Sequence, residues 1–505
     1  MFKKILIANR GEITVRIIRA CRELRITAAV IYSEADRKSL SVRYADEAYC
    51  VGPPPSIESY LCIDKIIEIA KKCKAEAIHP GYGFLAENAD FSDICRKNGL
   101  VFIGPGPEAI ESMGEKTRAR QLMSAAGVPV IPGSLAPVKD ADEALEIARQ
   151  TGFPIMIKAA FGGGGKGMRL VNEEKDLAEA FHIAGSESMA AFGNPSLYIE
   201  KYIEDPHHIE IQILADHFGN AIHLGERDCS IQRRHQKIIE ETPSPFINEA
   251  IRYQMGEIAV RAAKAVNYVN AGTIEFLVDG NKNFYFMEMN TRLQVEHPIT
   301  EMVTGIDIVK KQINIAAGLP LGYKQEDIHF KGHAIECRIY AEDPDNNFYP
   351  CPGKIVNLSL PGGPSIRDDS GVYEGFEVPI YYDPLLSKLV VWGRTRDEAI
   401  DRMGRALEEY KVKGIKTTIP FYRRVMSDSN YRKGIFNTKY VDQVFSKQDA
   451  AREHPLLSVA IIAAAIAEYE SKQNNIINND NKVVSKSHWK TSGRQGLLRG
   501  RLNNR

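Results

Sequence analysis

Six polar side chains are concentrated within residues 273–297, TIEFLVDGNKNFYFMEMNTRLQVEH. They are Glu275, Glu288, Asn290, Arg292, Gln294 and Glu296. Carboxylate and amide oxygens are the donors that Mg²⁺ and Mn²⁺ prefer, and a guanidinium suits a small planar oxyanion. From Glu288 onward the members share one parity, so an extended backbone would direct them to one face. The spacing predicts a divalent-metal site beside an oxyanion site; the alternative is a solvated polar face.

The two halves of this stretch, TIEFLVD and FYFMEMN, are predicted to form a β-hairpin around the turn residues 280–283. A symmetric register gives three facing pairs: Glu275 with Glu288, Leu277 with Phe286, and Asp279 with Phe284. Opposed side chains have Cβ atoms about 5 Å apart. Two carboxylates at that spacing repel by about 3 kcal/mol at an effective dielectric of 20. A cation bound between Glu275 and Glu288 removes this repulsion.

A glycine-rich segment, FGGGGKGM at residues 161–168, follows a predicted strand that ends near Lys158. Consecutive glycines suit a backbone that approaches phosphates closely and moves. A P-loop is excluded because Gly167, not Ser or Thr, follows Lys166, and because MRLV predicts a strand where a P-loop needs a helix. The segment is therefore predicted to be a flap between two strands over a nucleotide; the alternative is an ordinary surface loop.

The composition of the 505 residues is that of a soluble globular protein. Lys and Arg number 65, as do Asp and Glu, so nothing favours nucleic acid or an acidic membrane as a partner. The eight cysteines form no Cys-x-x-Cys pair and are expected to be reduced thiols. The longest nearly apolar run, residues 455–467, is too short to span a bilayer. Because MFKKILIANRGE enters a predicted strand at once, we expect no targeting peptide and a cytoplasmic location.

Short buried-strand patterns alternate with helical patterns over residues 1–112, which predicts a doubly wound, Rossmann-like domain. The string ILIANRGE has one glycine where the dinucleotide fingerprint needs three, so NAD is not expected. Residues 226–241, ERDCSIQRRHQKIIEE, are either a basic binding segment or an ordinary basic loop. Cys229 within them is expected to pack rather than act as a nucleophile, because no catalytic partner lies beside it in sequence.

Several strings resemble biotin carboxylase, a family of the ATP-grasp superfamily. They are KILIANRGEI, HPGYGFLAEN, IKAAFGGGGKGMR, ERDCSIQRRHQK, FMEMNTRLQVEHP and ECRIYAEDP. The resemblance runs in order from residue 1 to about 445 and is most specific at EMNTRLQVEH, residues 288–297. It implies a mixed α/β and α+β fold. The implied parts are a Rossmann-like N-terminal domain at 1–112, an ATP-grasp domain at 113–330 with a flap subdomain at 131–203, a C-terminal biotin carboxylase domain at 331–445, and an extension at 446–505.

The resemblance also implies a reaction, an ATP-dependent ligase reaction that forms a C–N bond by carboxylating biotin. In the family, bicarbonate attacks the γ-phosphate of ATP and gives carboxyphosphate. Carboxyphosphate breaks down to CO₂ and phosphate, and the phosphate removes the proton from the ureido nitrogen of biotin. The implied cofactors are ATP, Mg²⁺ or Mn²⁺, and biotin carried on a separate chain.

The family's site residues transfer to this chain position by position, with no departure at any of them. For the nucleotide, the implied residues are Lys116 and Lys158 on the phosphates, Gly164 and Gly165 in the flap, Glu200, Lys201 and Ile203 at the adenine and ribose hinge, and His208, Gln232 and His235. The implied metal ligands are Glu275 and Glu288, with Asn290 at a second metal position. For bicarbonate and biotin they are Lys237, Arg292, Gln294, Val295, the general base Glu296, and Arg338, which stabilises the biotin enolate.

After residue 445 the chain departs from the shortest members of the family. It adds about sixty residues, with a helical pattern at 456–469, a polar spacer and a basic end, but no Ala-Met-Lys-Met motif for a biotinyl lysine. The tail resembles the ATP-binding chain of two-chain pyruvate carboxylases, which implies a carrier–carboxyltransferase partner chain and a homodimer or larger hetero-oligomer. The alternatives are the biotin carboxylase chain of an acetyl-CoA or other acyl-CoA carboxylase, half of a carbamoyl-phosphate synthase, and an inactive ATP-binding regulatory protein.

Overall fold

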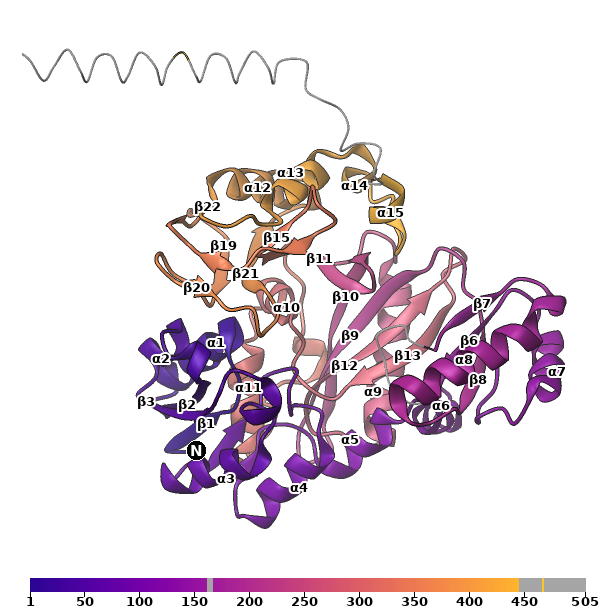
Figure 1. Ribbon diagram of the computed structural model, residues 1–505, viewed down its shortest axis with the longest axis horizontal. Helices are drawn as coiled ribbons and strands as arrows, with labels where there is room; N and C mark the ends of the chain where they lie inside the picture. The colour runs from indigo at the N-terminus through magenta and orange to yellow at the C-terminus, as the bar shows by residue number, and fades with distance from the viewer. Residues whose placement is uncertain (161–166, 445–465, 467–505) are drawn as a thin grey trace, which may run out of the picture. The chain divides into compact units, whose positions relative to one another are not determined.

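The computed structural model describes residues 1–160, 167–444 and 466 (Figure 1). The chain divides into two units, Met1–Val444 and Phe445–Arg505, and the elements below belong to the first. The predicted tail helix, polar spacer and basic end fall outside the described residues, apart from Ile466. Within the described ranges, no helix has the length and apolar character needed to cross a membrane.

The first part of the chain forms a five-stranded parallel sheet in the order β3-β2-β1-β4-β5. Alternate residues of β1 face opposite sides: Ile5 packs in one core cluster with α1, and Leu6 packs in another with α3 and α4. The predicted doubly wound fold is therefore confirmed. The strands are β1 (Lys4–Ile7), β2 (Thr27–Ser33), β3 (Glu47–Gly52), β4 (Ala77–His79) and β5 (Val101–Phe102). The helices are α1 (Gly11–Glu23), α2 (Leu40–Tyr44), α3 (Ile63–Lys72), α4 (Ala89–Lys97) and α5 (Pro107–Gly114).

A small three-stranded sheet, in the order β7-β6-β8, carries the segments that flank the glycine-rich residues. Strands β6 and β7 pair antiparallel, as expected for a flap between two strands, and the next described element after β6 is β7 rather than the helix that a P-loop needs. Helices α7 and α8 cover this sheet (Figure 1), and their apolar residues join its core. The bounds are α6 (Lys116–Ala125), α7 (Ala141–Thr151), β6 (Ile155–Ala159), β7 (Arg169–Val171), α8 (Leu177–Phe192) and β8 (Leu197–Lys201).

The largest element is an eight-stranded antiparallel sheet in the order β13-β12-β9-β10-β11-β14-β21-β19. Residues 226–241 form most of β10 and β11, so the loop alternative for this basic segment is wrong. Helix α9 (Glu249–Ala265) packs its apolar side on one face of the sheet. The strands are β9 (His207–Ala215), β10 (Ala221–Arg233), β11 (Gln236–Thr242), β12 (Asn270–Val278), β13 (Phe284–Asn290), β14 (His333–Tyr340), β19 (Ile366–Ser370) and β21 (Leu385–Gly393).

This sheet runs without a break across the domain boundary predicted at residue 330, because β11 pairs with β14. The predicted domain limits therefore stay predictions. The strands that carry the site and the C-terminal strands belong to the same hydrogen-bonded sheet. The remaining helices are α10 (His297–Thr304), α11 (Ile308–Ala316), α12 (Arg396–Glu409), α13 (Ile419–Ser427), α14 (Ser429–Arg432) and α15 (Tyr440–Val444). The short strands are β15 (Glu342–Asp343), β16 (Tyr349–Pro350), β17 (Gly353–Lys354), β18 (Asn357–Ser359), β20 (Glu377–Val378) and β22 (Lys411–Lys413).

The turn of the β12–β13 hairpin differs from the expected one. It contains Asp279 as a fifth residue, because the Asp279 carboxylate accepts the N–H groups of Asn281 and Asn283 (both 2.9 Å) and holds the loop. The expected pairs Leu277–Phe286 and Asp279–Phe284 are therefore wrong. The observed pairs next to the turn are Val278 with Phe284, Leu277 with Tyr285, and Phe276 with Phe286.

A β-bulge at Met287 corrects the register before the functional residues. Phe276 pairs with Phe286 and Glu275 pairs with Glu288, so Met287 has no partner on β12. A bulge re-aims the residues that follow it. Phe286 therefore packs in the core cluster, whereas Glu288 lies beside Glu275 on the other face. The predicted opposition of the two glutamates is confirmed, although it depends on an irregularity that the sequence pattern did not predict.

Truncating the core side of this hairpin should destabilise the fold. Phe276 is fully buried, and its ring meets Phe284 edge-to-face with centroids 5.5 Å apart. We expect Phe276→Ala to lower the free energy of unfolding by about 3–5 kcal/mol, measured by denaturant unfolding. Tyr253→Ala on α9, where the side chain is 62% exposed, is the control and should change it by about 0.5 kcal/mol or less. Equal effects would contradict this account of the core.

Candidate active site

Four charged side chains share one rung of the central sheet. The rung crosses four adjacent strands in the order Glu288, Glu275, Glu210 and Arg227. Glu210 and Arg227 are fully buried, and Glu275 is 3% exposed. Strand alternation causes this, because Ile209 and Ile211 on β9 fill the core face and leave Glu210 to the opposite face. The fold thus gathers three carboxylates against one guanidinium in a nearly dry environment.

The ammonium of Lys237 on β11 lies at the centre of the buried carboxylates. Its Nζ atom donates to Glu210 Oε2 (2.5 Å), Glu275 Oε1 (2.7 Å) and Glu296 Oε1 (2.9 Å). Arg227 forms a second ion pair with Glu210. Burial would lower the pKa of Lys237, but Glu210, Glu275 and Glu296 together raise it well above its ordinary value. Lys237 is therefore a fixed positive charge at the heart of the site.

The carboxyl groups of the cluster have different pKa values, because the nearby cations do not affect them equally. Burial would raise the pKa of Glu275 and of Glu296, but nearby cations, Lys237 first, hold both pKa values below the ordinary range. Burial raises the pKa of Glu288, and the charge of Glu275 raises it further. The pKa of Glu210 is also raised, with burial as the main cause. Glu275 and Glu296 are therefore ionised, whereas Glu288 lies where an additional cation would be stabilised.

Residues 290–296 converge on the same cluster without an extended backbone. Strand β13 ends at Asn290, and the chain then bends toward α10. Arg292 donates from Nη2 to Asn290 Oδ1 and from Nη1 to Gln294 Oε1, both at 2.8 Å. Gln294 in turn donates to Glu275 Oε1 (2.9 Å). The expected convergence is observed, but hydrogen bonds between side chains produce it rather than strand alternation.

Glu275 and Glu288 suit a divalent cation better than Asn290 does in this arrangement. The two carboxylates face each other, and both are oxygen donors of the kind that Mg²⁺ and Mn²⁺ take. The Asn290 amide donates from Nδ2 to Glu275 Oε1 (2.8 Å) and accepts at Oδ1 from Arg292. These partners fix the orientation of the amide, so its oxygen reaches a metal only after Arg292 releases it.

A second group with metal-ligand geometry comprises His208, Glu210 and Glu275, whose ligand atoms lie within 4.8 Å of one another. His208 Nε2 is 2.9 Å from Glu275 Oε2, and its Nδ1 contacts the amide of Gln232 (3.0 Å). Lys237 already contacts both carboxylates of this group. Because an ammonium occupies the position of a cation there, the Glu275–Glu288 pair is the better metal candidate.

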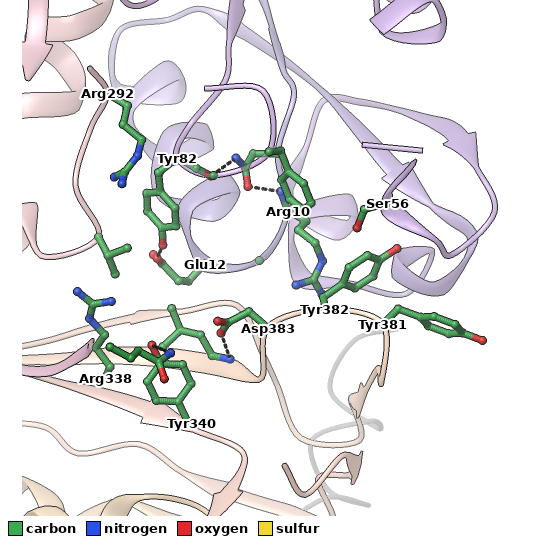
Figure 2. A pocket seen from close by; sticks show the side chains of 17 residues that line it. Arg10, Glu12, Ser56, Tyr82, Arg292, Arg338, Tyr340, Tyr381, Tyr382 and Asp383 are labelled. Carbon is green, nitrogen blue, oxygen red and sulfur yellow. Dashed lines mark hydrogen bonds between the residues drawn. The ribbon is translucent and has the colours of Figure 1, made fainter. Parts of the chain in front are cut away.

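A cavity of about 510 Å³ opens beside the cluster and is lined by Arg292, Val295, Arg338 and Tyr82 (Figure 2). Arg338 on β14 extends its guanidinium toward the side of the cavity where Arg292 and Tyr82 lie. Its Nη2 atom is 2.9 Å from Glu296 Oε2. Glu296 therefore lies between two cations, Lys237 on one oxygen and Arg338 on the other. This places a buried, ionised carboxylate next to a cavity that three arginines line, Arg10, Arg292 and Arg338.

The residues predicted for the nucleotide are distributed around the rung. The charge of Lys116, at the start of α6, partly opposes the rise in the pKa of Glu288, so these two groups are close. Lys158 Nζ is 2.5 Å from Glu200 Oε2 on the neighbouring strand β8. Lys201 donates instead to the carbonyl oxygens of residues 152 and 153 (both 2.9 Å), so its ammonium is turned away from Glu200.

Some predicted residues are not brought into the cluster by a described contact. His235 is exposed on the turn between β10 and β11, where its φ is 66°. Ile203 is half-buried after β8. Gly164 and Gly165 lie outside the described residues. Cys229 is buried, as expected for a packing residue, and burial raises the pKa of its thiol well above the ordinary value. The sequence did not predict its neighbour: the thiol donates to Glu296 Oε1 (3.8 Å).

Sequence reasoning missed three residues that complete the site. Glu210 could have been found from HHIEIQIL, where polar residues alternate with isoleucines in a wholly buried strand. Glu87 accepts from the Thr291 N–H (2.9 Å) and from Arg292 Nε (2.8 Å) and holds the loop from the N-terminal sheet. Lys388 is fully buried and donates to the Val295 carbonyl oxygen (2.8 Å). Glu87 lies within HPGYGFLAEN, one of the strings that carry the family resemblance, so the sequence held a signal for it. No local pattern marks Lys388, because it acts through a contact distant in sequence.

Three family models match successive parts of the chain. They are "Biotin carboxylase, N-terminal domain" at residues 1–110, "Carbamoyl-phosphate synthase L chain, ATP binding domain" at 115–324, and "Biotin carboxylase C-terminal domain" at 336–443. Together they span the sheets that build the cluster and the cavity. The expected mixed fold, with its ATP-grasp and C-terminal parts, is confirmed by these matches and by solved structures.

Relatives in other organisms match over nearly their whole length. Biotin carboxylase 1 of Bacillus subtilis is 55% identical over 443 residues, which cover 88% of this chain and 98% of that protein. A pyruvate carboxylase subunit of Methanothermobacter thermautotrophicus is 53% identical over 486 residues, 93% of this chain and 99% of that protein. The biotin carboxylase domain of 2-oxoglutarate carboxylase from Hydrogenobacter thermophilus, a dimer solved with MgADP and bicarbonate, has a TM-score of 0.84 at 50% identity and covers 88% of this chain and 98% of that chain. The chain therefore belongs to the biotin carboxylase family, the ATP-dependent ligases that carboxylate biotin.

Proposed function

We propose that the cluster around Lys237 is where this biotin carboxylase activates bicarbonate with ATP. The observation that carries the proposal is Glu296, an ionised buried carboxylate held between Lys237 and Arg338 at the edge of the cavity. The nucleotide is assigned to the space between the flap and the central sheet. Its proposed contacts are Lys116, Lys158, Gly164, Gly165, Glu200, Lys201, Ile203, His208, Gln232 and His235.

A divalent cation is proposed to bind between Glu275 and Glu288, with Asn290 as a further ligand once Arg292 turns to substrate. Mg²⁺ or Mn²⁺ bound there would offset negative charge on the phosphate oxygens during transfer. Lys237 is proposed to contact bicarbonate and the transferred phosphate. Its three carboxylate partners hold it in place before substrates arrive, so little reorganisation is needed when they do.

Bicarbonate is proposed to bind to Arg292, Gln294 and the backbone of Val295, with Glu296 as its base. Lys237 and Arg338 keep the pKa of Glu296 below its ordinary range, so Glu296 is ionised but weakly basic in this arrangement. When Lys237 turns to a phosphate oxygen and Arg338, staying in place, shares its charge with biotin, the stabilisation of ionised Glu296 falls and its basicity rises. Arrival of the substrates therefore prepares the base for taking the bicarbonate proton.

The finer assignment is to a pyruvate carboxylase that works with a separate carrier–carboxyltransferase chain. It is supported by the match to the Methanothermobacter pyruvate carboxylase subunit over 486 residues, against 443 residues for Biotin carboxylase 1. The longer match takes in residues beyond those shared with the shorter relative. A biotin carrier on a separate chain is also consistent with the described cavity, because biotin on a mobile carrier reaches the cavity at a high effective concentration. The second candidate is a 2-oxoglutarate carboxylase, because the small subunit of that enzyme from Hydrogenobacter thermophilus matches at 49% identity over 472 residues, also 93% of this chain.

Neutralising the proposed base should abolish turnover without unfolding the protein. We expect Glu296→Gln to lower biotin-dependent turnover by about 10²–10⁴-fold while ATP binding is retained, because the amide cannot take the bicarbonate proton. Turnover is measured by phosphate release with free biotin, and ATP binding by calorimetry. Glu249→Gln, on the exposed start of α9, is the matched control. Turnover of Glu296→Gln equal to that of the control would refute the assignment.

Metal should stabilise the opposed glutamates. We expect ATP with Mg²⁺ to raise the melting temperature more than ATP with a chelator does, because only the metal offsets the repulsion between Glu275 and Glu288. In Glu288→Gln the opposed pair loses one charge, so the extra stabilisation by metal should shrink. Differential scanning fluorimetry measures all four conditions. Equal protection of the wild type with and without metal would disprove the proposed site.

Assignment to a two-chain pyruvate carboxylase predicts that this chain alone carboxylates free biotin slowly and does not carboxylate pyruvate. Adding a biotinylated carrier–carboxyltransferase chain should give oxaloacetate from pyruvate, with 2-oxoglutarate and acetyl-CoA as parallel acceptors. Truncation after Ser446 should weaken copurification with that chain and spare the free-biotin activity. Equal copurification by both forms would show that the tail is not needed for docking, and acetyl-CoA carboxylation alone would replace the pyruvate assignment.

A further inference from the structure

Two buried glutamates behind the cavity take no part in the proposed mechanism. Glu240 on β11 pairs directly with Glu336 on β14, and both are 0% exposed. Opposed residues of antiparallel strands have Cβ atoms about 5 Å apart. Two ionised carboxylates at that distance, shielded from water, would repel strongly. The Glu240–Glu336 pair therefore needs a proton, a cation, or both.

One cation contacts the pair closely. Nη2 of Arg338 is 2.6 Å from Glu240 Oε1, and the same atom is 2.9 Å from Glu296 Oε2. Apart from this ion pair, none of the described side chains or backbone groups donates a hydrogen bond to the carboxylate oxygens of Glu240 and Glu336. The guanidinium of Arg338 is thus anchored at one corner by two carboxylates, and the remainder extends toward the cavity (Figure 2).

The other charged groups that face the Glu240–Glu336 pair already have other partners. Lys237 contributes to the field at Glu240 but is bonded to the three carboxylates of the central cluster. Lys388 on β21 contributes to the field at Glu336 but donates to the Val295 carbonyl oxygen and pairs with Glu12 (3.1 Å). Glu296 adds negative charge near both glutamates. Arg338 can balance one carboxylate of the pair, so the other must keep its proton.

Glu240 is easier to ionise than Glu336. Burial raises the pKa of Glu336 well above its ordinary value, and Glu240 raises it further. Burial also raises the pKa of Glu240, but Arg338 opposes the rise and leaves it at about 7. Glu336 is therefore the neutral partner at neutral pH, and Glu240 is the one that carries the charge.

We propose that Glu240 is a positioning residue for Arg338, and that Glu336 makes this possible by holding the proton of the pair. The proposal rests on the role given above to Arg338 at the biotin site. It explains how Arg338 stays in place during turnover. When the bicarbonate proton passes to Glu296, that carboxyl group loses its charge and its attraction for Nη2 falls. Glu240, which takes no proton in this step, still holds the guanidinium toward the cavity.

The test compares two substitutions that are chemically the same. Glu240→Gln removes the anchoring charge, so we expect the KM for free biotin to rise about tenfold or more, with nucleotide binding unchanged. Glu336→Gln replaces a neutral acid by a neutral amide of the same shape and should change the KM for biotin by less than about threefold. Steady-state kinetics with free biotin gives kcat and KM separately, and calorimetry with ATP measures nucleotide binding.

The pH dependence separates positioning from a loss of folding. In the wild type, Glu240 is charged above pH 7 and neutral below it, so the KM for biotin should rise as pH falls from about 8 to about 6. In Glu240→Gln the KM for biotin should be raised at both pH values and should not change between them. Glu336→Gln should keep the pH dependence of the wild type. A wild-type KM and pH profile for Glu240→Gln, or equal effects of the two substitutions, would overturn the proposal.

Two further variants keep the outcomes distinct. Arg338→Gln should lose nearly all biotin-dependent turnover; if it does not, the proposed role of Arg338 fails. If Arg338→Gln is inactive while Glu240→Gln behaves as wild type, Arg338 acts without Glu240 and only the positioning proposal fails. Should Glu240→Gln not fold, Glu240→Asp carries the test, because it keeps the charge but withdraws it from Nη2. An unchanged KM for biotin in Glu240→Asp would likewise overturn the proposal.

Discussion

The position of the Lys237 ammonium among Glu210, Glu275 and Glu296 is the interaction on which the rest of the site depends. Removing one partner of a buried ion pair typically costs about 3–5 kcal/mol, because the remaining charge has neither water nor a counter-ion. Here one ammonium contacts three carboxylates, with Arg227 and Arg338 as further counter-charges, so a change in any of them affects the others. The cluster is stable only as a set.

This dependence shapes the surrounding architecture. The carboxylates need a position that is closed to water yet open to substrate, and the central sheet provides it by alternating isoleucines with polar residues on β9. Segments from elsewhere then fix the groups that these strands cannot hold. Glu87 reaches Arg292 from the loop between β4 and α4, and Lys388 reaches the Val295 carbonyl oxygen from β21. Three distant parts of the chain therefore meet at residues 292–296.

The same electrostatics connects binding to chemistry. The cations proposed to bind substrates also neutralise Glu275 and Glu296, so under this proposal substrates would replace existing ion pairs with their own. Ion pairs in a dry site need little rearrangement of solvent when they exchange. The arrangement can hold reactive charges ready without leaving any of them exposed, and it gives each substrate a defined effect on the remaining groups.

The sequence alone determined the doubly wound N-terminal sheet, the two strands that flank the glycine-rich segment, and the meeting of Glu275 with Glu288. Each of these depends on local patterns: β/α alternation, a glycine run between apolar strands, and two apolar segments around a turn. The spacing from Glu288 to Glu296 also identified the groups that converge. These features could be predicted because the hydrophobic period and the turn residues act over a few positions along the chain.

Only the tertiary structure decided how those groups are neutralised and aimed. The bulge at Met287 sets which face Glu288 occupies, and it arises from the five-residue turn that Asp279 organises. The partners Glu210, Glu87 and Lys388, and the opposition of Glu240 to Glu336, come from strand pairing and contacts between segments far apart in sequence. Burial and counter-charge, and hence the pKa of each carboxyl group, exist only once those segments are packed together.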